Sequence, residues 1–284
     1  MRAQSEFNWM FVIVAGVIIL AFFVNFAFKY KSFQDEKLSI ELLINLDNSL
    51  STLQASPYST FDTISLPRDL EITCNNLQIA NKKYPNEKII FSPKNLKDKI
   101  YIYYKQFNFP FKIENFYYII SSKDKFYLVY NINDAISREF AESLINNLPD
   151  KFKQNVNLVS SKQPNGKNIF INLNSNTNDV KIFLNQDKTS ISYNNKVYND
   201  VNQELVYAAI FSDDFECNYN KIKPAMEKLI LIYLNKLTSL QNSNCNYASF
   251  TTYLQKLKDL NYQDIKPVEE LNKNLASLNC PVLY

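Results

Sequence analysis

The residues whose chemistry is easiest to interpret are four cysteines, Cys74, Cys217, Cys245 and Cys280. No two of them are close enough in sequence to form a C-x-x-C pair, which argues against a tetrahedral zinc site. The chain contains no histidine, so a Cys–His nucleophile is impossible, and the commonest general base and metal ligand are missing. Two interpretations stay open: four buried thiols of a cytosolic domain, or two disulfides of an exported one.

Helix lengths favour the second interpretation and predict the pairing. Cys217 and Cys245 stand at opposite ends of a predicted long helix, roughly 40 Å apart at the helical rise per residue, so they cannot bond. Each of the next two predicted helices is about half that length, so together they return Cys280 to Cys245. We therefore predict a Cys245–Cys280 disulfide and a second bond from Cys74 to Cys217, which closes a long loop and stabilises the fold by a few kcal/mol.

A cluster of carboxylates, Asp213, Asp214 and Glu216, lies beside the second cysteine. Paired acids can perform general acid–base catalysis or bind a hard cation. Acids at a helix N-terminus also interact favourably with its macrodipole, and we prefer this structural interpretation. The sequence has no G-x-S-x-G motif, and its two glycines, Gly16 and Gly166, cannot build a phosphate-binding loop. No catalytic residue, metal site or cofactor is predicted, and we expect a non-enzyme.

The charge of the chain argues against nucleic acid as a partner. Thirty-one basic residues face 28 acidic ones, and the net charge of +3 is spread evenly. Nucleic-acid binding needs a concentrated basic face instead. The sequence also contains no N-x-S/T glycosylation acceptor although asparagine is abundant, which is a weak sign of a surface exposed outside the cytoplasm.

Residues 9–28 predict a transmembrane helix. An apolar run is interrupted once, at Asn25, and its twenty residues span roughly 30 Å, the thickness of a bilayer core. Trp9 and Tyr30 stand at its two ends, where amphipathic rings prefer the lipid headgroups. The run is longer than the apolar core of a secretory signal, and no small-x-small site follows it. We therefore expect an uncleaved single-pass anchor in the lipid bilayer.

The flanking charges do not orient this helix. Arg2 and Glu6 precede it, and Lys29 and Lys31 follow it, so the positive-inside rule is nearly balanced. The orientation therefore depends on the cysteines. Disulfides form in oxidising compartments, so the predicted bonds favour an extracytoplasmic domain.

The rest of the chain predicts an α+β fold. Residues 36–53 form an amphipathic helix that continues the membrane helix as a stalk or packs back on the domain. A Ser/Thr-rich linker follows to residue 67. Strands are then predicted at 70–79, 88–91, 99–104, 116–120 and 126–130, the last two as a hairpin.

A strand–helix–strand unit is predicted across 126–159. Its helix covers 135–147, is capped by Asp134, and has an apolar stripe of Ile136, Phe140, Leu144 and Ile145. Further strands are expected at 156–159, 169–173, 180–184 and 190–193, the last turning through Asn194 and Asn195 into 196–198. Helices follow at 202–211, 218–241, around 247–257, and from Pro267 to 278.

These elements divide the chain into four parts. Residues 1–31 are a short tail and the transmembrane anchor, and 32–67 are the stalk helix and linker. Residues 68–200 form a mixed β-sheet domain with a βαβ element. Residues 201–284 are a helical hairpin or bundle packed on that sheet.

Two resemblances add to this interpretation. Met1-Arg2-Ala3-Gln4-Ser5-Glu6 resembles the start of archaeal type IV pilin-like precursors, which are cleaved just before the Gln, although their acidic residue lies five positions into the mature chain and Glu6 would be the third. Residues 7–16, 207–212, 216–218 and Asn279-Cys280 resemble uncharacterised single-pass membrane proteins of small-genome archaea. The second family implies no activity and transfers no functional residue.

The combined expectation is a membrane-anchored protein that displays an α+β domain outside the cytoplasm. Its role is non-enzymatic binding or envelope assembly, with other envelope or surface proteins as partners. A type IV pilin-like subunit is the second hypothesis. A membrane-tethered hydrolase that uses the clustered carboxylates is the third, and a scaffold facing the cytosol stays open if the cysteines are reduced.

Overall fold

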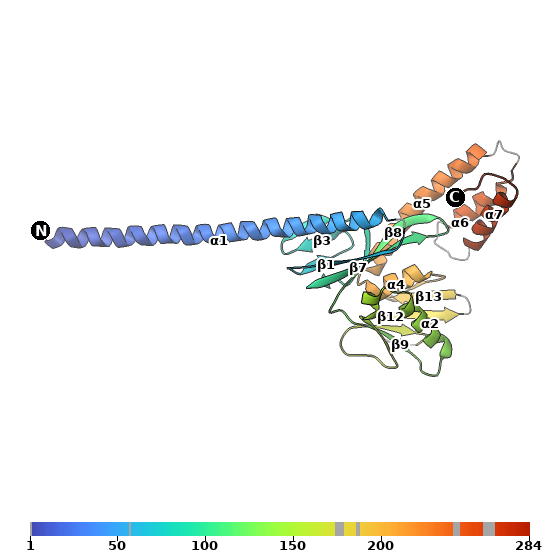
Figure 1. Ribbon diagram of the computed structural model, residues 1–284, viewed down its shortest axis with the longest axis horizontal. Helices are drawn as coiled ribbons and strands as arrows, with labels where there is room; N and C mark the ends of the chain where they lie inside the picture. Colours follow the sequence, from blue (N-terminus) through green and yellow to red (C-terminus); the bar gives the residue numbers. More distant parts are fainter. Residues whose placement is uncertain (1, 57, 174–178, 186–187, 241–244, 258–264) are drawn as a thin grey trace.

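A long helix and a β-rich head make up the α+β fold of this chain (Figure 1). The computed structural model describes residues 2–56, 58–173, 179–185, 188–240, 245–257 and 265–284. Met1 and Pro57, the first residue of the predicted linker, lie outside the described residues. Helix α1 (Arg2–Gln54) is continuous over 53 residues, roughly 80 Å at 1.5 Å per residue. The predicted membrane helix and stalk are therefore one element.

The first half of α1 projects away from the head (Figure 1). Its apolar segment has a mean hydropathy of 2.8 and none of it is buried. Within the described residues it is the one helix that is long and apolar enough to cross a membrane. Trp9 and Tyr30, the predicted interface residues, are 72% and 57% exposed, so neither ring is covered by the protein.

The second half of α1 packs on the head. Leu43, Leu46 and Leu50 follow one another at helical spacing and are fully buried against a small sheet. Tyr117 donates a hydrogen bond of 2.9 Å from its hydroxyl to the carbonyl of Leu50. Both alternatives for the amphipathic segment therefore hold: it continues the apolar helix and it packs back on the domain.

That small sheet has the strand order β4-β3-β2-β6, with β2 (Leu70–Ile72), β3 (Asn76–Ile79), β4 (Lys82–Pro85) and β6 (Asn95–Leu96). The prediction of one strand over 70–79 is wrong, because residues 73–75 turn the chain and β2 pairs with β3 in an antiparallel hairpin. The alternating burial of each short strand faces its apolar residues toward α1.

A second sheet has the order β1-β7-β8-β5, with β1 (Thr60–Ser65), β5 (Ile89–Phe91), β7 (Lys99–Asn108) and β8 (Lys112–Ser121). Strand β1 lies in the segment predicted as a linker, so that prediction is wrong there. Its threonines, Phe61 and Ile64 are residues that favour strands, and β1 pairs with β7 along its whole length.

The third sheet has the order β10-β9-β11-β12-β13-β14. Its strands are β9 (Phe126–Tyr130), β10 (Val156–Val159), β11 (Lys167–Ile171), β12 (Val180–Asn185), β13 (Lys188–Tyr193) and β14 (Lys196–Tyr198). Strands β9 and β10 are parallel and are joined by α2 (Ala135–Asn146) and α3 (Asp150–Lys153), which confirms the βαβ unit. Asn194 and Asn195, with φ of 48° and 63°, form the predicted turn into β14.

The predicted hairpin of 116–120 with 126–130 is wrong. Strand β8 pairs instead with β7, while β9 belongs to the third sheet. The β7–β8 ladder has nine residue pairs, so it pairs more backbone N–H and C=O groups than a five-residue hairpin could. The segment between β8 and β9 is a crossing between sheets, and its Asp124 carboxylate accepts a hydrogen bond from the Ser121 amide at 2.6 Å.

Helix α2 begins as predicted, and three of the four residues of its predicted apolar stripe pack in or against the core. The Asp134 carboxylate accepts hydrogen bonds from the amides of Ile136 and Ser137, which makes it the N-cap. Leu144 is buried, and Phe140 and Ile145 pack against the core, but Ile136 is 67% exposed. Two small residues, Ser137 and Ala141, are buried on the same helix and permit close approach to the sheet.

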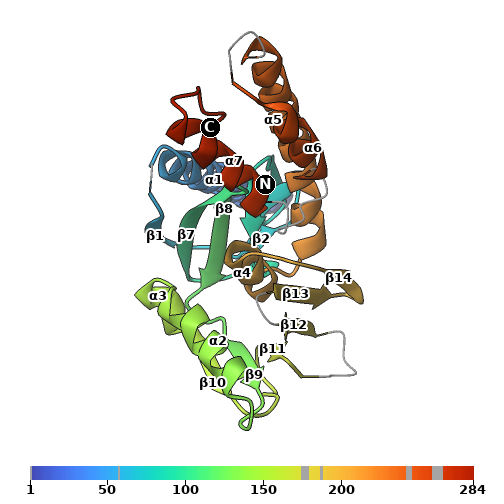
Figure 2. The same cartoon turned by 90° about the vertical axis from the view of Figure 1, so that its right-hand side faces the viewer.

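In the described residues after β14 the chain forms the helices α4 (Gln203–Phe211), α5 (Phe215–Leu240), α6 (Ala248–Lys256) and α7 (Ile265–Ser277). Every residue of α4 from Leu205 to Phe211 is buried. Figure 2 shows α4 between the β7–β8 sheet and the β9–β14 sheet, and it contacts β5, β8, β12 and β13. Helix α5 leads away toward α6 and α7 at the end of the head opposite the apolar segment of α1 (Figure 1).

We expect Leu46→Ala to lower the free energy of unfolding by about 2–5 kcal/mol, because it leaves a cavity between α1 and the small sheet. Ile44→Ala is the matched control on the exposed face of the same helix, with an expected loss below about 1 kcal/mol. Near-UV circular dichroism of the full chain in detergent, followed through a guanidinium titration, measures both. Equal losses would show that the leucine face does not anchor the head.

Candidate functional site

The first candidate site surrounds the bond between Cys74 and Cys217. Cys74 lies in the turn between β2 and β3, Cys217 lies in the first turn of α5, and their Cα atoms are 6.0 Å apart. The second predicted bond joins Cys245 to Cys280 across the ends of α6 and α7, also with 6.0 Å between Cα atoms. Both predicted pairings are therefore present, and none of the four cysteines is free.

Residues around the first disulfide hold the β2–β3 turn against α5. The Asp214 carboxylate accepts a hydrogen bond of 3.2 Å from the Cys74 amide. The Lys221 ammonium donates to the Cys74 carbonyl and, at 3.3 Å, to the Asn86 carbonyl. Cys74, Cys217 and Asp214 also gather their sulfur and oxygen atoms within 4.8 Å. Because both sulfurs are bonded to each other, this group offers a metal one carboxylate and no thiolate.

The other two clustered acids have separate partners. Asp213 accepts a hydrogen bond of 3.0 Å from the Lys94 amide, while its own amide donates to the Ser92 carbonyl. Glu216 forms an ion pair with Lys196 of β14. Each carboxylate of the cluster therefore braces a different segment at the start of α5. Of the three acids, Glu216 lies in the first turn of α5, where the structural interpretation expects a carboxylate.

A second site was not predicted from the sequence and lies beside this cluster. A cavity of about 340 Å³ is lined by residues that include Asp124, Lys125, Phe126, Gly166, Lys167 and Asp213. Lys167 opens β11, and Asp124 lies in the crossing that leads to β9. Because β9 and β11 are parallel neighbours, the start of β11 and the segment that precedes β9 lie at the same end of the third sheet.

Lys167 is held at the C-terminal end of α4. Its ammonium donates to the carbonyls of Ala209 and Ser212 and lies 3.7 Å from a carboxylate oxygen of Asp213. Cations are favoured there because the last carbonyls of a helix lack intrahelical partners. Burial lowers the pKa of Lys167 to about 8, although Asp213 opposes that shift.

Asp124 shows the opposite shift. Burial raises the pKa of its carboxyl to about 6, the hydrogen bond from the Ser121 amide opposes the rise, and the charge of Asp213 adds to it. Groups whose pKa values are shifted toward neutral pH cluster at functional sites, and here the two shifted groups line the same cavity. The lining residues include no serine, threonine, tyrosine or cysteine, and therefore no hydroxyl or thiol nucleophile.

Gly166, which precedes β11, permits the close approach of β11 and the segment around β9 at this cavity. Its φ is +116°, and a Cβ at this position would lie 2.5 Å from the Lys125 carbonyl oxygen and 2.8 Å from the Tyr127 ring. A side chain therefore does not fit. Gly166 is the only glycine beyond the apolar segment and follows Asn165, and this isolated Asn-Gly pair is the signal that could have indicated the site.

We expect removal of the Cys74–Cys217 bond to destabilise the protein more than removal of the Cys245–Cys280 bond. The bonds close loops with sequence separations of 143 and 35, for which chain entropy gives about 5 and about 4 kcal/mol. Guanidinium unfolding of the two double alanine variants measures the difference. A smaller loss for Cys74→Ala/Cys217→Ala would contradict the loop-entropy argument.

Asp124 generates a pH-dependence with a defined sign. Its pKa of about 6 in the folded chain exceeds the ordinary value of 3.8, so the folded state binds more protons between these pH values. The contribution of Asp124 to the free energy of unfolding therefore falls as pH rises from 4 to 6. Asp124→Asn removes this contribution, about 1–2 kcal/mol for a partly exposed carboxyl. Asp150→Asn, at a side chain that is 92% exposed, is the control. Identical pH profiles of the two variants would refute the shift.

No family model matches the chain, and no curated protein or solved structure matches it either. Its function is therefore inferred from its own residues. The features available for that inference are an exposed apolar helix, a head that contains two disulfides, and a cavity lined by lysines and two aspartates.

Proposed function

We propose that this protein is anchored in a membrane by the first half of α1 and displays its α+β head outside the cytoplasm, where the head has a non-enzymatic role in binding or envelope assembly. The observation that carries the proposal is the continuity of α1. One helix runs without a break from an exposed apolar half to a second half whose leucine face packs on the small sheet of the head. The hydrocarbon core of a bilayer would bury the apolar surface of the exposed half.

The energetics support this assignment. In water, a long exposed apolar surface is costly, at about 25 cal/mol for each Å² that could be buried. In lipid, the same helix satisfies all its backbone polar groups internally, as a membrane-spanning segment must. The continuous helix then carries the orientation of the membrane segment into the head, since no hinge separates the two.

The disulfides support an extracytoplasmic head. Both bonds tie together elements of the head that are distant in sequence, and within the described residues all four cysteines are used. Such bonds persist in oxidising compartments and are reduced in the cytosol. Partners of the head are then other envelope or surface proteins, and the lipid bilayer is the partner of α1.

A pilin-like subunit is the second candidate, and the same helix favours it. A helix whose apolar half protrudes and whose second half packs on a β-rich head can leave the bilayer and bundle with copies of itself. The resemblance of the first six residues to pilin-like precursors agrees with this arrangement. Cleavage before Gln4 together with recovery of the protein in sheared filaments supports it, whereas an intact Met1–Arg2 end in purified membranes contradicts it.

We expect a membrane-impermeant maleimide to leave the cysteines of intact cells unlabelled until a membrane-impermeant reductant is added. The disulfides first protect the thiols, and the reductant reaches them because the head faces outward. A variant with all four cysteines changed to alanine is the control for other labelling. Free thiols that react only after lysis would place the head in the cytosol and overturn the proposal.

A further inference from the structure

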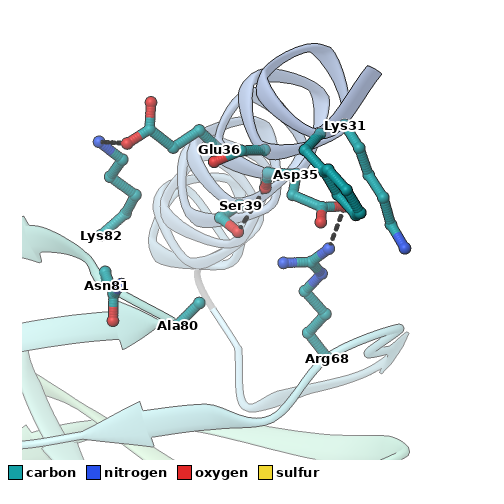
Figure 3. Close-up of a pocket in the computed structure, with 10 residues that line it drawn as sticks. Lys31, Asp35, Glu36, Ser39, Arg68, Ala80, Asn81 and Lys82 are labelled. Atoms are coloured by element: carbon teal, nitrogen blue, oxygen red, sulfur yellow. Dashed lines mark hydrogen bonds and ion pairs between the residues drawn. The ribbon is translucent and has the colours of Figure 1, made fainter. Parts of the chain in front are cut away.

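A pocket lies where α1 leaves the head (Figure 3). It has a volume of about 340 Å³, and its lining includes Phe28, Lys31, Asp35, Glu36, Arg68 and Lys82. The first four belong to α1. Arg68 precedes β2, and Lys82 begins β4 after a turn that also lines the pocket. The pocket is therefore formed between the helix and the edge of the small sheet nearest to the apolar segment.

The position of this pocket relates it to the bilayer, and this step rests on the proposed membrane anchoring of α1. Phe28 is the last residue of the apolar run, and Lys31 follows one turn later. When the run spans the hydrocarbon core, Phe28 lies at its boundary and the charged residues lie in the headgroup layer. A lipid headgroup can then enter the pocket from its membrane side.

The chemistry of the pocket fits a phosphate group. Three cations and two carboxylates line it, which leaves one positive charge in excess. Arg68 donates to the Asp35 carboxylate at 2.5 Å, and Lys82 pairs with Glu36 (Figure 3). Among the described residues Lys31 has no hydrogen bond or ion pair, and Figure 3 shows its ammonium extending away from α1 on the side of Arg68. Lys31 is therefore a cation without a counter-ion at the mouth of the pocket.

The two ion pairs position the Arg68 and Lys82 cations and leave some of their N–H donors available for a ligand. Arg68 has five N–H donors, and the one bond to Asp35 leaves its remaining donors for a ligand. Guanidinium groups match phosphate oxygens in a bidentate geometry, and ammonium groups add point charges. The Arg68 and Lys82 side chains are about one-third exposed, so a ligand can reach them.

We propose that this pocket binds the phosphate of an anionic membrane lipid, of which phosphatidylglycerol is the test example. Lys31, Arg68 and Lys82 contact the phosphate, and Phe28 contacts the acyl chains next to the headgroup. A bound lipid would hold the edge of the small sheet against the bilayer. The head would then keep a fixed orientation above the membrane.

The test uses the full chain in detergent, titrated with phosphatidylglycerol or phosphatidylcholine, with bound lipid counted by native mass spectrometry. We expect tighter binding of phosphatidylglycerol, because its headgroup carries a net negative charge. Lys31→Gln weakens this binding about fivefold, the effect of one basic residue near an anionic lipid surface. Lys266→Gln, in α7 at the opposite end of the head, leaves the affinity unchanged, and far-UV circular dichroism verifies that both variants are folded.

Three outcomes overturn the proposal. Equal affinity for the two lipids would show that the net negative charge of the headgroup is not recognised. Equal effects of Lys31→Gln and Lys266→Gln would show general electrostatic attraction without a specific site. Inorganic phosphate that competes at the same concentration as the lipid indicates a free-anion site. Insertion of the full chain into phosphatidylcholine nanodiscs requires only the apolar helix. A chain that does not insert contradicts the proposed anchoring, whereas a chain that inserts without preferring phosphatidylglycerol contradicts only the lipid site.

Discussion

The burial of α4 on all sides is the constraint on which the head depends. The Phe211 ring at its end packs against Phe126 and Phe152, with ring centroids 5.0 and 5.2 Å apart. These partners come from the third sheet and its crossover, whereas other residues of α4 contact β5 and β8 of the second sheet. A helix with no solvent-exposed face from Leu205 onward needs both sheets in place, and the sheets meet through it.

The polar groups around α4 follow from this burial. Lys105 pairs with Glu204 at its first turn, and Lys167 donates to the carbonyls at its last turn, so a charged residue stabilises each end. The same arrangement places Lys167 beside Asp213. The acids that follow α4 then hold the β2–β3 turn and the strand-connecting segment near residue 94. The position of α4 therefore determines where the carboxylate cluster that follows it lies, and which segments the cluster can reach.

Helix α1 is attached to this core through a second, smaller one. Leu43, Leu46 and Leu50 cover the small sheet, and the Cys74–Cys217 bond joins the same sheet to α5. Forces on the apolar half of α1 can therefore pass through packed side chains and a covalent bond to the C-terminal helices. This rigidity suits either proposed role, because a displayed head and a filament subunit both need a defined orientation relative to the helix.

The sequence by itself determined the features that depend on neighbouring residues. These are the apolar run of α1, the Asp134 cap and the Asn194-Asn195 turn. The expected helix lengths also predicted both disulfide pairings, but the choice between free thiols and disulfides stayed open. Only the tertiary structure decided that β8 pairs with β7, that Thr60–Ser65 is a strand, and that Asp124 and Lys167 share a cavity. A strand partner and a pKa shift both depend on residues distant in sequence. The tertiary neighbours of a strand decide its pairing, and the tertiary neighbours of a side chain decide its desolvation.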